Sequence, residues 1–247
     1  MNFEEVPQEE YSLPFGGFYK QVKKFKDYNG LELEVYDESI LDQYIKVPNL
    51  MFYQDGIDLS TQQNFEIGYD VVTQRITVPW RSTSGELIGI MGRKNKREIE
   101  EGENKWFPII SFPKSRVLYG FSENYKSIQD NGVVFVGESE KFTLGLKSMN
   151  IPYGLSLGGS SLSQIQANNI KSLFCKKIVI GLDEGMDKGT SHEMAVKLKM
   201  NRFFKNTVYY IYDKNNLFLP KGSKMSPTDL PKADFKRIIK HCLVKVD

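Results

Sequence analysis

The second half of the chain alternates short apolar runs with longer amphipathic stretches, and this rhythm limits the possible folds more than any other feature. Strands are predicted where β-branched and aromatic residues cluster, at 133–136, 153–157, 178–182 and 208–212. Helices are predicted between and after them, at 139–149, 161–174, 191–203 and 230–244. Repeated β-α units bury both faces of a parallel sheet under helices. We therefore expect an α/β fold with a largely parallel, Rossmann-like sheet.

The first half follows a different pattern. A helix is expected over 38–47 and a short one near Ser60, where Ser60 and Thr61 are good N-caps. The period then changes to two, which predicts a β-hairpin from 75–80 and 86–91 around a turn at 82–85. The first 35 residues have no regular pattern, and we expect irregular structure there.

These patterns predict three parts. Residues 1–130 form an α+β subdomain with a basic β-hairpin, residues 131–215 form the parallel-sheet domain, and residues 216–247 form a short helical segment.

Composition excludes several classes of protein. The chain is 40% hydrophobic and 26% charged, which is typical of a globular protein. No apolar run approaches the roughly 18 residues of a membrane-spanning helix, and the acidic start of the chain does not resemble a secretory signal. Two cysteines cannot form a zinc ribbon. We expect a soluble, cytoplasmic protein that has no membrane partner and holds no zinc itself.

Charge is distributed unevenly along the chain. Residues 1–130 carry 15 Lys and Arg against 21 Asp and Glu, a balance of −6, whereas residues 131–247 carry 18 against 10, a balance of +8. A basic surplus of this kind favours a polyanionic partner such as nucleic acid. A solvated charged face explains the same surplus without any partner.

Two acidic residues follow predicted strands. Glu138 comes after the strand at 133–136, and Asp183 comes after the strand at 178–182. In an open parallel sheet, ligands bind at the carboxyl ends of the strands. Converging carboxylates repel one another, and a divalent cation with oxygen ligands, Mg²⁺ or Mn²⁺, relieves this repulsion. The alternative is that each acid caps the following helix.

The residues around these acids resemble a known family. The segment from Phe135 to Glu140 resembles the first motif of the Toprim family, a strand that ends in a catalytic Glu. The segment 151–165 resembles the second strand, glycine turn and helix of that family, and 178–183 resembles the strand that leads into its Asp-x-Asp motif. This resemblance implies that Glu138 and Asp183 are catalytic and ligate metal.

Upstream residues narrow the resemblance to DnaG-type primases. Segments 75–81 and 85–93 resemble the basic hairpin of these primases, and 112–120 resembles their Lys-x-x-x-Leu-Tyr-Gly signature. Segment 226–231 resembles the Asp-Pro segment that follows the Toprim domain. The resemblance covers roughly residues 40–240 and is closest to compact, phage-type primases. It implies that basic residues line the template or nucleotide groove: Arg75, Arg81, Arg93, Lys94, Lys114 and Arg116.

The chain departs from the family pattern in two places. The second aspartate of the Asp-x-Asp motif is replaced by Gly185, so Glu184 or Asp187 becomes the candidate third metal ligand. The glycine that usually follows the catalytic Glu is Ser139. Neither a zinc module before the core nor a Walker motif after it is found.

The resemblance implies a DNA primase, a DNA-directed RNA polymerase that makes short RNA primers from NTPs on single-stranded DNA during replication. A replicative helicase and a separate zinc-binding module are the expected protein partners, and the location is the cytoplasm, that of the host if the chain is phage-encoded. Two alternatives stay open: a Toprim-type metal-dependent nuclease, and a non-catalytic DNA-binding subunit of the replisome.

Overall fold

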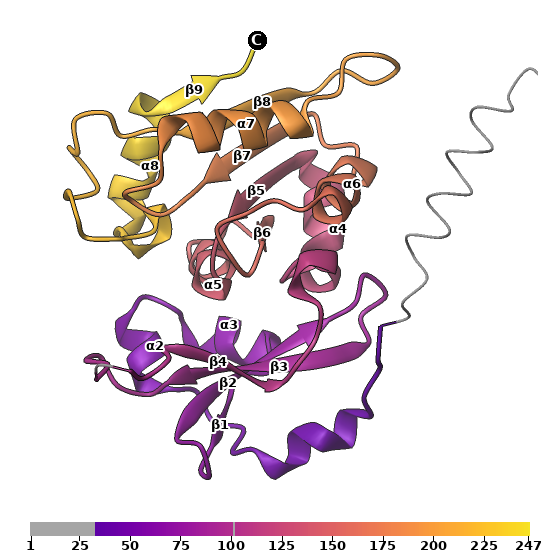
Figure 1. Cartoon of the computed structure of the whole chain (residues 1–247), viewed down its shortest axis with the longest axis vertical. Coiled ribbons are helices and arrows are strands. Elements are labelled where there is room, and N and C mark those ends of the chain that lie inside the picture. The colour runs from indigo at the N-terminus through magenta and orange to yellow at the C-terminus, as the bar shows by residue number, and fades with distance from the viewer. Residues whose placement is uncertain (1–32, 101) are drawn as a thin grey trace, which may run out of the picture. The chain divides into compact units, whose positions relative to one another are not determined.

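Two sheets organise residues 33–100 and 102–247, the part of the chain that the structure, a computed structural model, describes (Figure 1). The first sheet is antiparallel, with neighbouring strands in chain order: β1 (Gly68–Asp70), β2 (Arg75–Arg81), β3 (Leu87–Lys94) and β4 (Trp106–Ile110). The predicted hairpin is therefore confirmed as β2 and β3. Strands β1 and β4, which extend it, were not predicted because three-residue and weakly alternating strands carry little periodic signal.

Short helices cover this first sheet. They are a 3₁₀ helix, η1 (Glu38–Gln43), and two α-helices, α2 (Leu50–Gln54) and α3 (Leu59–Asn64). The expected helix over 38–47 is wrong in type and length, because the helix ends at Gln43 and Ile45 pairs with Tyr69 of β1. The helix expected near Ser60 is confirmed as α3, but Asp58 is its N-cap. Helix α2, capped by Asn49, was missed.

The second sheet has the order β6-β5-β7-β8-β9 within the described residues. The first four of these strands are parallel: β5 (Val133–Gly137), β6 (Gly154–Ser156), β7 (Lys177–Gly181) and β8 (Thr207–Ile211). Strand β9 (Leu243–Lys245) is antiparallel to β8. The predicted α/β class and largely parallel sheet are thus confirmed. The helix expected to extend to residue 244 is wrong at its end, because Leu243 pairs with Ile211 across this edge.

Alternate residues of the central strands point into two different cores. Val134 and Val136 of β5 lie in one core with α4 (Phe121–Asn131), α6 (Gln164–Ser172) and α7 (Lys188–Leu198). Phe135 lies in the opposite core with α5 (Glu140–Ser148) and α8 (Lys232–His241). Because side chains alternate with a period of two, apolar residues at every position of β5 bury both faces of the sheet.

Local hydrogen bonds set the ends of these helices. Helix α7 begins at Lys188 because the Asp187 carboxylate accepts the Thr190 amide, three residues earlier than expected. It ends at Leu198, where the Asn206 amide donates to the Leu198 carbonyl and so stops the predicted continuation to 203. Helix α4, which was not predicted, packs with the second sheet.

The chain from Val35 to Asp247 forms one compact unit. The predicted boundaries near residues 130 and 215 stay predictions. The irregular segment expected over the first 35 residues lies outside the described residues except at 33–35. No helix in the part that the structure describes is long and apolar enough to cross a membrane.

Trp80 at the end of β2 joins the first sheet to helix α5. Its indole N–H donates to the buried Glu140 carboxylate at 3.1 Å, and its ring contacts Phe112 and Tyr119 with centroid distances of 4.9 and 5.2 Å. The Lys114 ammonium lies 3.9 Å from the same carboxylate. Burial raises the pKa of Glu140, while Lys114 and the Trp80 N–H oppose that shift. Trp80 therefore satisfies a carboxylate that would otherwise be costly to bury.

The two partners of this hydrogen bond should be energetically coupled. We expect Trp80→Phe to lower the free energy of unfolding by about 1–3 kcal/mol more than its smaller volume explains, because the Glu140 carboxylate is left without its donor. The double variant Trp80→Phe, Glu140→Leu should be less destabilised than the sum of the two single variants. Urea unfolding of all four proteins measures this coupling. Single effects that add to within about 0.5 kcal/mol would contradict it.

Candidate active site at the carboxyl ends of β5 and β7

Two glycines bring the candidate carboxylates together. Gly137 and Gly181 pair across β5 and β7 as the last residues of both strands. A Cβ built on Gly137 would lie 2.1 Å from the Phe142 ring, and one on Gly181 would lie 2.9 Å from it. Absence of side chains there lets Phe142, and with it α5, lie directly over the strand ends. Glu138 immediately follows the first of these glycines and Asp183 follows the second by two residues, at one edge of the sheet.

The two predicted catalytic carboxylates are neighbours. The Glu138 Oε1 atom accepts a hydrogen bond from the Asp183 backbone amide at 3.1 Å. Asp183 Oδ1 is buried and has no hydrogen-bond partner in the described part of the chain. Burial, followed by repulsion from Glu138 and Asp229, raises the pKa of Asp183 to about 7. An unpartnered buried carboxylate oxygen beside a second carboxylate is a place where a cation would lower the energy.

Both candidates for the third ligand are used locally. Glu184 accepts the Lys224 amide at 3.2 Å, and its own amide donates to the Met225 carbonyl. Asp187 caps α7. The carboxylate that acts on Asp183 after Glu138 is instead Asp229, whose position in segment 226–231 was the available signal. Asp229 accepts the Ser226 amide and lies 3.3 Å from the Lys141 ammonium.

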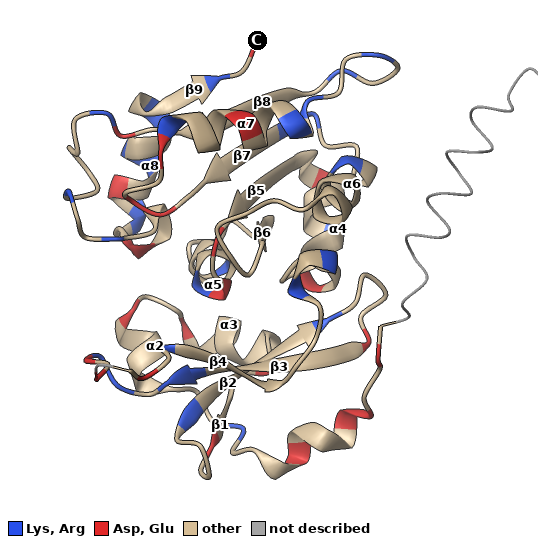
Figure 2. Ribbon diagram, in the orientation of Figure 1, with Lys and Arg blue, Asp and Glu red and all other residues tan. Residues whose placement is uncertain are grey.

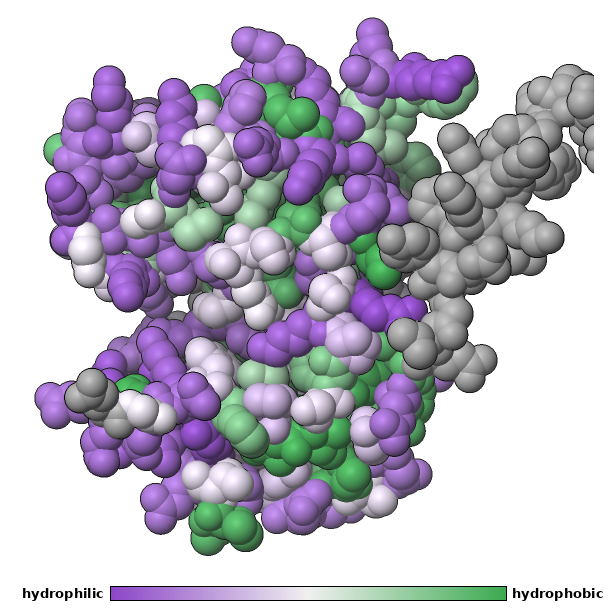
Figure 3. Space-filling model, in the orientation of Figure 1, coloured by the Kyte–Doolittle hydropathy of each residue, from purple (hydrophilic) through white to green (hydrophobic). Residues whose placement is uncertain are grey.

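A basic cavity of about 660 Å³ adjoins this acidic group. Residues of α2, β3, α5, α8 and their connections line it, with these charged members: Asp55, Arg93, Arg97, Lys105, Lys141, Asp229 and Lys232. Figure 3 shows a notch at this level, on the left edge between α8 and α2. Burial and the nearby cations Arg93 and Lys141 lower the pKa of Lys105, while Asp229 and Asp183 oppose this shift. The cavity is thus within electrostatic reach of Asp183.

Arg93 is the member of the predicted basic set that lines this cavity. Its residue is 5% exposed, its Nε is buried without a partner among the described residues, and its terminal nitrogen donates to the carbonyls of Lys94 and Lys96. Lys105 and Lys141 were not predicted. Lys141 lies in the first turn of α5, three residues after Glu138, and this closeness in sequence was its available signal.

Other members of the predicted basic set have internal partners. The Arg75 guanidinium donates to the carbonyls of Gly92, Asn104 and Lys105. Arg81 pairs with Glu38 and Glu66, and these carboxylates raise its pKa despite its partial burial. Both guanidinium groups therefore bind groups of the chain itself, a use that the sequence pattern alone does not distinguish from phosphate binding.

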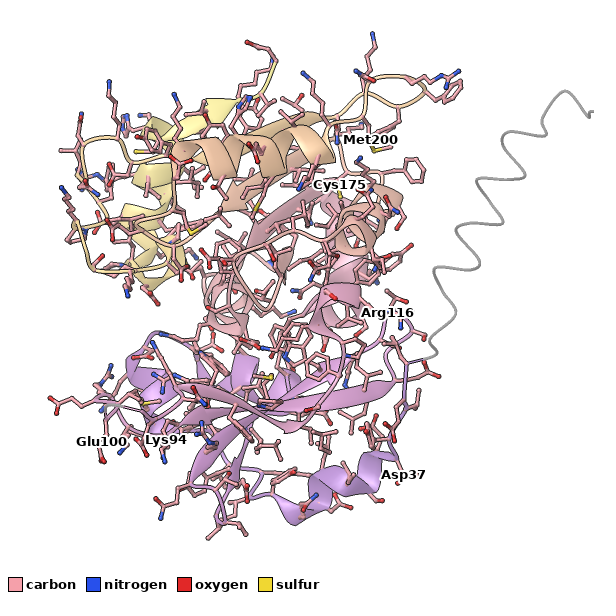
Figure 4. All side chains as sticks on the ribbon, viewed as in Figure 1. Asp37, Lys94, Glu100, Arg116, Cys175 and Met200 are labelled. Carbon is pink, nitrogen blue, oxygen red and sulfur yellow. The ribbon has the colours of Figure 1, made fainter. Side chains whose placement is uncertain are left out.

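The remaining three do not form a single cluster. Lys94 pairs with Glu103 at 2.9 Å. Lys114 lies over the Trp80 ring, 5.9 Å from its centroid. Figure 4 shows Lys94 and Arg116 far apart in the view, so the structure does not gather the six residues into one groove. Their role in binding nucleic acid stays a prediction.

The residues present fit a divalent cation in one respect and fall short in another. Two carboxylates, one with an unpartnered oxygen, are the oxygen ligands that Mg²⁺ accepts. In the described ranges, however, no group of three Asp, Glu, His or Cys side chains is assembled to hold a metal ion. Mg²⁺ is commonly held by one or two carboxylates together with water and substrate phosphates, so a third carboxylate is not a requirement for that ion.

The comparisons with known sequences find distant relatives. No known protein-family model matches the chain. It is 29% identical to the SPbeta prophage-derived uncharacterized protein YorJ of Bacillus subtilis (strain 168) over 181 residues. This match covers 68% of this chain and 46% of that protein. The chain is 29% identical over 159 residues to a DNA primase of Aquifex aeolicus (strain VF5), 62% of this chain and 28% of that protein. The chain therefore spans less than half the length of these curated relatives.

Burial of Asp183 has a consequence for stability in the absence of metal. A carboxyl whose pKa is raised by folding stabilises the fold while it is neutral, and this contribution disappears as the pH rises from its ordinary value of 3.8 to about 7. We expect Asp183→Asn to be more stable than the wild type by about 1–3 kcal/mol at pH 8 in EDTA, with the advantage shrinking toward pH 4.

Urea unfolding across this pH range measures the effect. Asp130→Asn, on the exposed end of α4, is the matched control and should follow the wild-type pH profile. An Asp183→Asn protein whose stability tracks the wild type at every pH would contradict the cost assigned to burying this carboxylate.

The comparisons with solved structures agree with the fold described above. The Aquifex aeolicus primase, with its zinc-binding and RNA polymerase domains, matches with a TM-score of 0.65 and 19% identity over 93% of this chain and 68% of that one. A DnaG primase catalytic domain bound to ssDNA matches with a TM-score of 0.62 and 16% identity, over 83% and 77%. The E. coli primase catalytic core matches at 0.58 and 17%, over 78% and 72%. The described part of this chain therefore has the fold of the DnaG-type primase catalytic core, as its sequence resemblance predicts.

Proposed function

We propose that the chain is the catalytic core of a DNA primase, which makes short RNA primers from NTPs on single-stranded DNA with Mg²⁺ or Mn²⁺. The observation that carries this proposal is the pair Glu138 and Asp183 at adjoining strand ends, with a basic cavity beside it. The fold shared with DnaG cores, one of them solved with ssDNA, supports the choice of reaction and template.

Each group has a part in nucleotidyl transfer. Glu138 and Asp183 would hold the divalent cation, which neutralises charge that develops on the phosphoryl oxygens. Arg93, Lys105 and Lys141 line the cavity beside them and would bind the triphosphate of the incoming nucleotide. Arginine suits this task because its planar fork donates two hydrogen bonds to one phosphate. Asp229 and Asp55 hold the Lys141 ammonium at 3.3 and 2.9 Å, which fixes it at the cavity wall.

The proposal includes partners that the described residues do not contain. A replicative helicase and a separate zinc-binding module would supply unwinding and template recognition. The Aquifex aeolicus primase that shares this fold was solved with a zinc-binding domain, which supports the second of these partners. Addition of such a module to the chain should raise primer output on natural templates.

Replacement of a metal-holding carboxylate tests the proposal. We expect Glu138→Ala to lower primer synthesis by about 10²-fold or more. Without Glu138 the divalent cation would be held less well, and the charge that develops on the phosphoryl oxygens would lose its main stabilisation. The affinity of this variant for single-stranded DNA should stay within about twofold of the wild type, since Glu138 makes no favourable contact with phosphate. Labelled NTPs on single-stranded DNA with Mg²⁺ or Mn²⁺ measure synthesis, and fluorescence anisotropy measures binding.

Glu193→Ala, an exposed carboxylate on α7, is the matched control and should behave as the wild type. Near-normal primers from Glu138→Ala would overturn the assignment. Degradation of labelled single-stranded DNA with metal and without nucleotides would favour a nuclease. Binding of DNA without either activity, and without stabilisation by Mg²⁺, would favour a non-catalytic subunit, because a bound ligand raises stability by mass action.

A further inference from the structure

The positive charge of the second half is concentrated after β8. Residues 214–245 carry eight Lys and Arg against two Asp, a balance of +6, within the +8 of residues 131–247. Figure 2 shows this charge in blue on α8 and on the loop between β8 and α8. None of these residues belongs to the basic set predicted from the hairpin. This surplus includes Lys232 of α8, which lines the cavity.

Three lysines of α8 form a single row. Lys232, Lys236 and Lys240 are four residues apart, which places them on one face of the helix. The opposite face is held in the core by Phe235 and Ile238, 1% and 0% exposed, so the helix cannot rotate to hide the row. With a rise of 1.5 Å per residue, the row extends over about 12 Å. Each of the three ammonium groups can neutralise one phosphate of a strand that runs along the row.

The row has no internal counter-charge. All three lysines are exposed, and none forms an ion pair with any residue in the described ranges. Their neighbour Arg237 differs, because it pairs with Asp234 and lies over the Phe218 ring. Arg75 and Arg81 of the hairpin also have internal partners. The lysine row is thus available to an external polyanion in a way that Arg75 and Arg81 are not.

The row begins at the cavity. Lys232 lines the cavity together with Arg93, Lys105 and Lys141, and Lys236 and Lys240 continue along α8 away from it. Like charges held in a row repel one another, and a bound polyanion relieves that repulsion. A surface that starts beside the carboxylates and continues outward is positioned for a strand, since a free nucleotide would occupy only its beginning.

We propose that Lys232, Lys236 and Lys240, the α8 lysine row, bind the phosphodiester backbone of single-stranded DNA where it runs beyond the carboxylate site. This inference rests on the proposed function for the choice of strand. Lysine ammonium groups contact phosphate as point charges, so the row holds the strand without reading its sequence. Binding through it depends on counterion release and therefore on salt concentration.

A triple variant tests the row directly. Lys232→Gln, Lys236→Gln, Lys240→Gln should make the log–log dependence of single-stranded DNA affinity on salt less steep by about 2, at about 0.7 for each phosphate that the row neutralises. The matched control is Lys126→Gln, Lys176→Gln, Lys197→Gln, which removes three exposed lysines from α4, α7 and the connection between α6 and β7. Anisotropy of labelled DNA between about 50 and 200 mM NaCl gives the slopes, and circular dichroism gives the folding of each variant.

A shallower slope in the row variant alone supports the proposal. Equal changes in both triple variants would mean that net charge, not the row, controls binding, and would overturn it. A row variant with the wild-type slope would overturn it as well, and this is the result expected if the row binds an acidic protein instead of DNA. A wild type without affinity for DNA would also overturn it. The assay contains no nucleotides, so a wild type that binds DNA through the row but makes no primers would overturn only the proposed function.

Discussion

The hydrogen bond from Trp80 to Glu140 is the interaction on which the arrangement of the two sheets depends. Trp80 lies near the end of β2 in the first sheet, and Glu140 begins the helix that lies over the ends of β5 and β7. Glycine at position 158 leaves room for the indole, because a Cβ there would lie 2.8 Å from the ring. The turn after β6, the hairpin and α5 therefore meet at one side chain. Since Glu138 is two residues before Glu140, the same contact fixes the candidate active site against the hairpin.

The pair Glu138 and Asp183 differs from Glu140, because its neighbours do not offset the cost of burying the Asp183 carboxylate. Asp183 has an oxygen without a donor, and its charge is opposed by Glu138 and Asp229. A stable fold would favour an amide here, whereas a site that must attract a cation needs the charge. Phe142 imposes this geometry, because its ring occupies the space that side chains at Gly137 and Gly181 would fill. The position of α5 over the strand ends is therefore part of the same arrangement that buries the Asp183 carboxyl.

Much of this could be predicted from the sequence because its signals are local. Continuous apolar runs identify β5 and β7, and the acids that follow them identify the edge of the sheet where ligands bind. The third acid could not be predicted in the same way, because Asp229 reaches Asp183 through a loop that packs from a distant part of the chain. Arg75 and Arg81 were predicted for charge alone, and only the tertiary structure reveals the carbonyls and carboxylates that they bind. Helix ends shifted for a related reason, since capping by Asp187 and Asn206 depends on particular hydrogen bonds.

The contrast between arginine and lysine in this chain follows from their chemistry. The guanidinium is planar and weakly hydrated, so it can bind several carbonyls at once inside a structure, as Arg75 does. The ammonium of lysine is strongly hydrated and stays at the surface unless an acid holds it, as Asp55 and Asp229 hold Lys141. Basic residues that look alike in the sequence therefore have two different roles in the folded chain. Arg75 and Arg81 of the hairpin are held by groups of the chain itself, and the lysines that remain without acids, above all those of α8, carry the charge that a nucleic acid would meet.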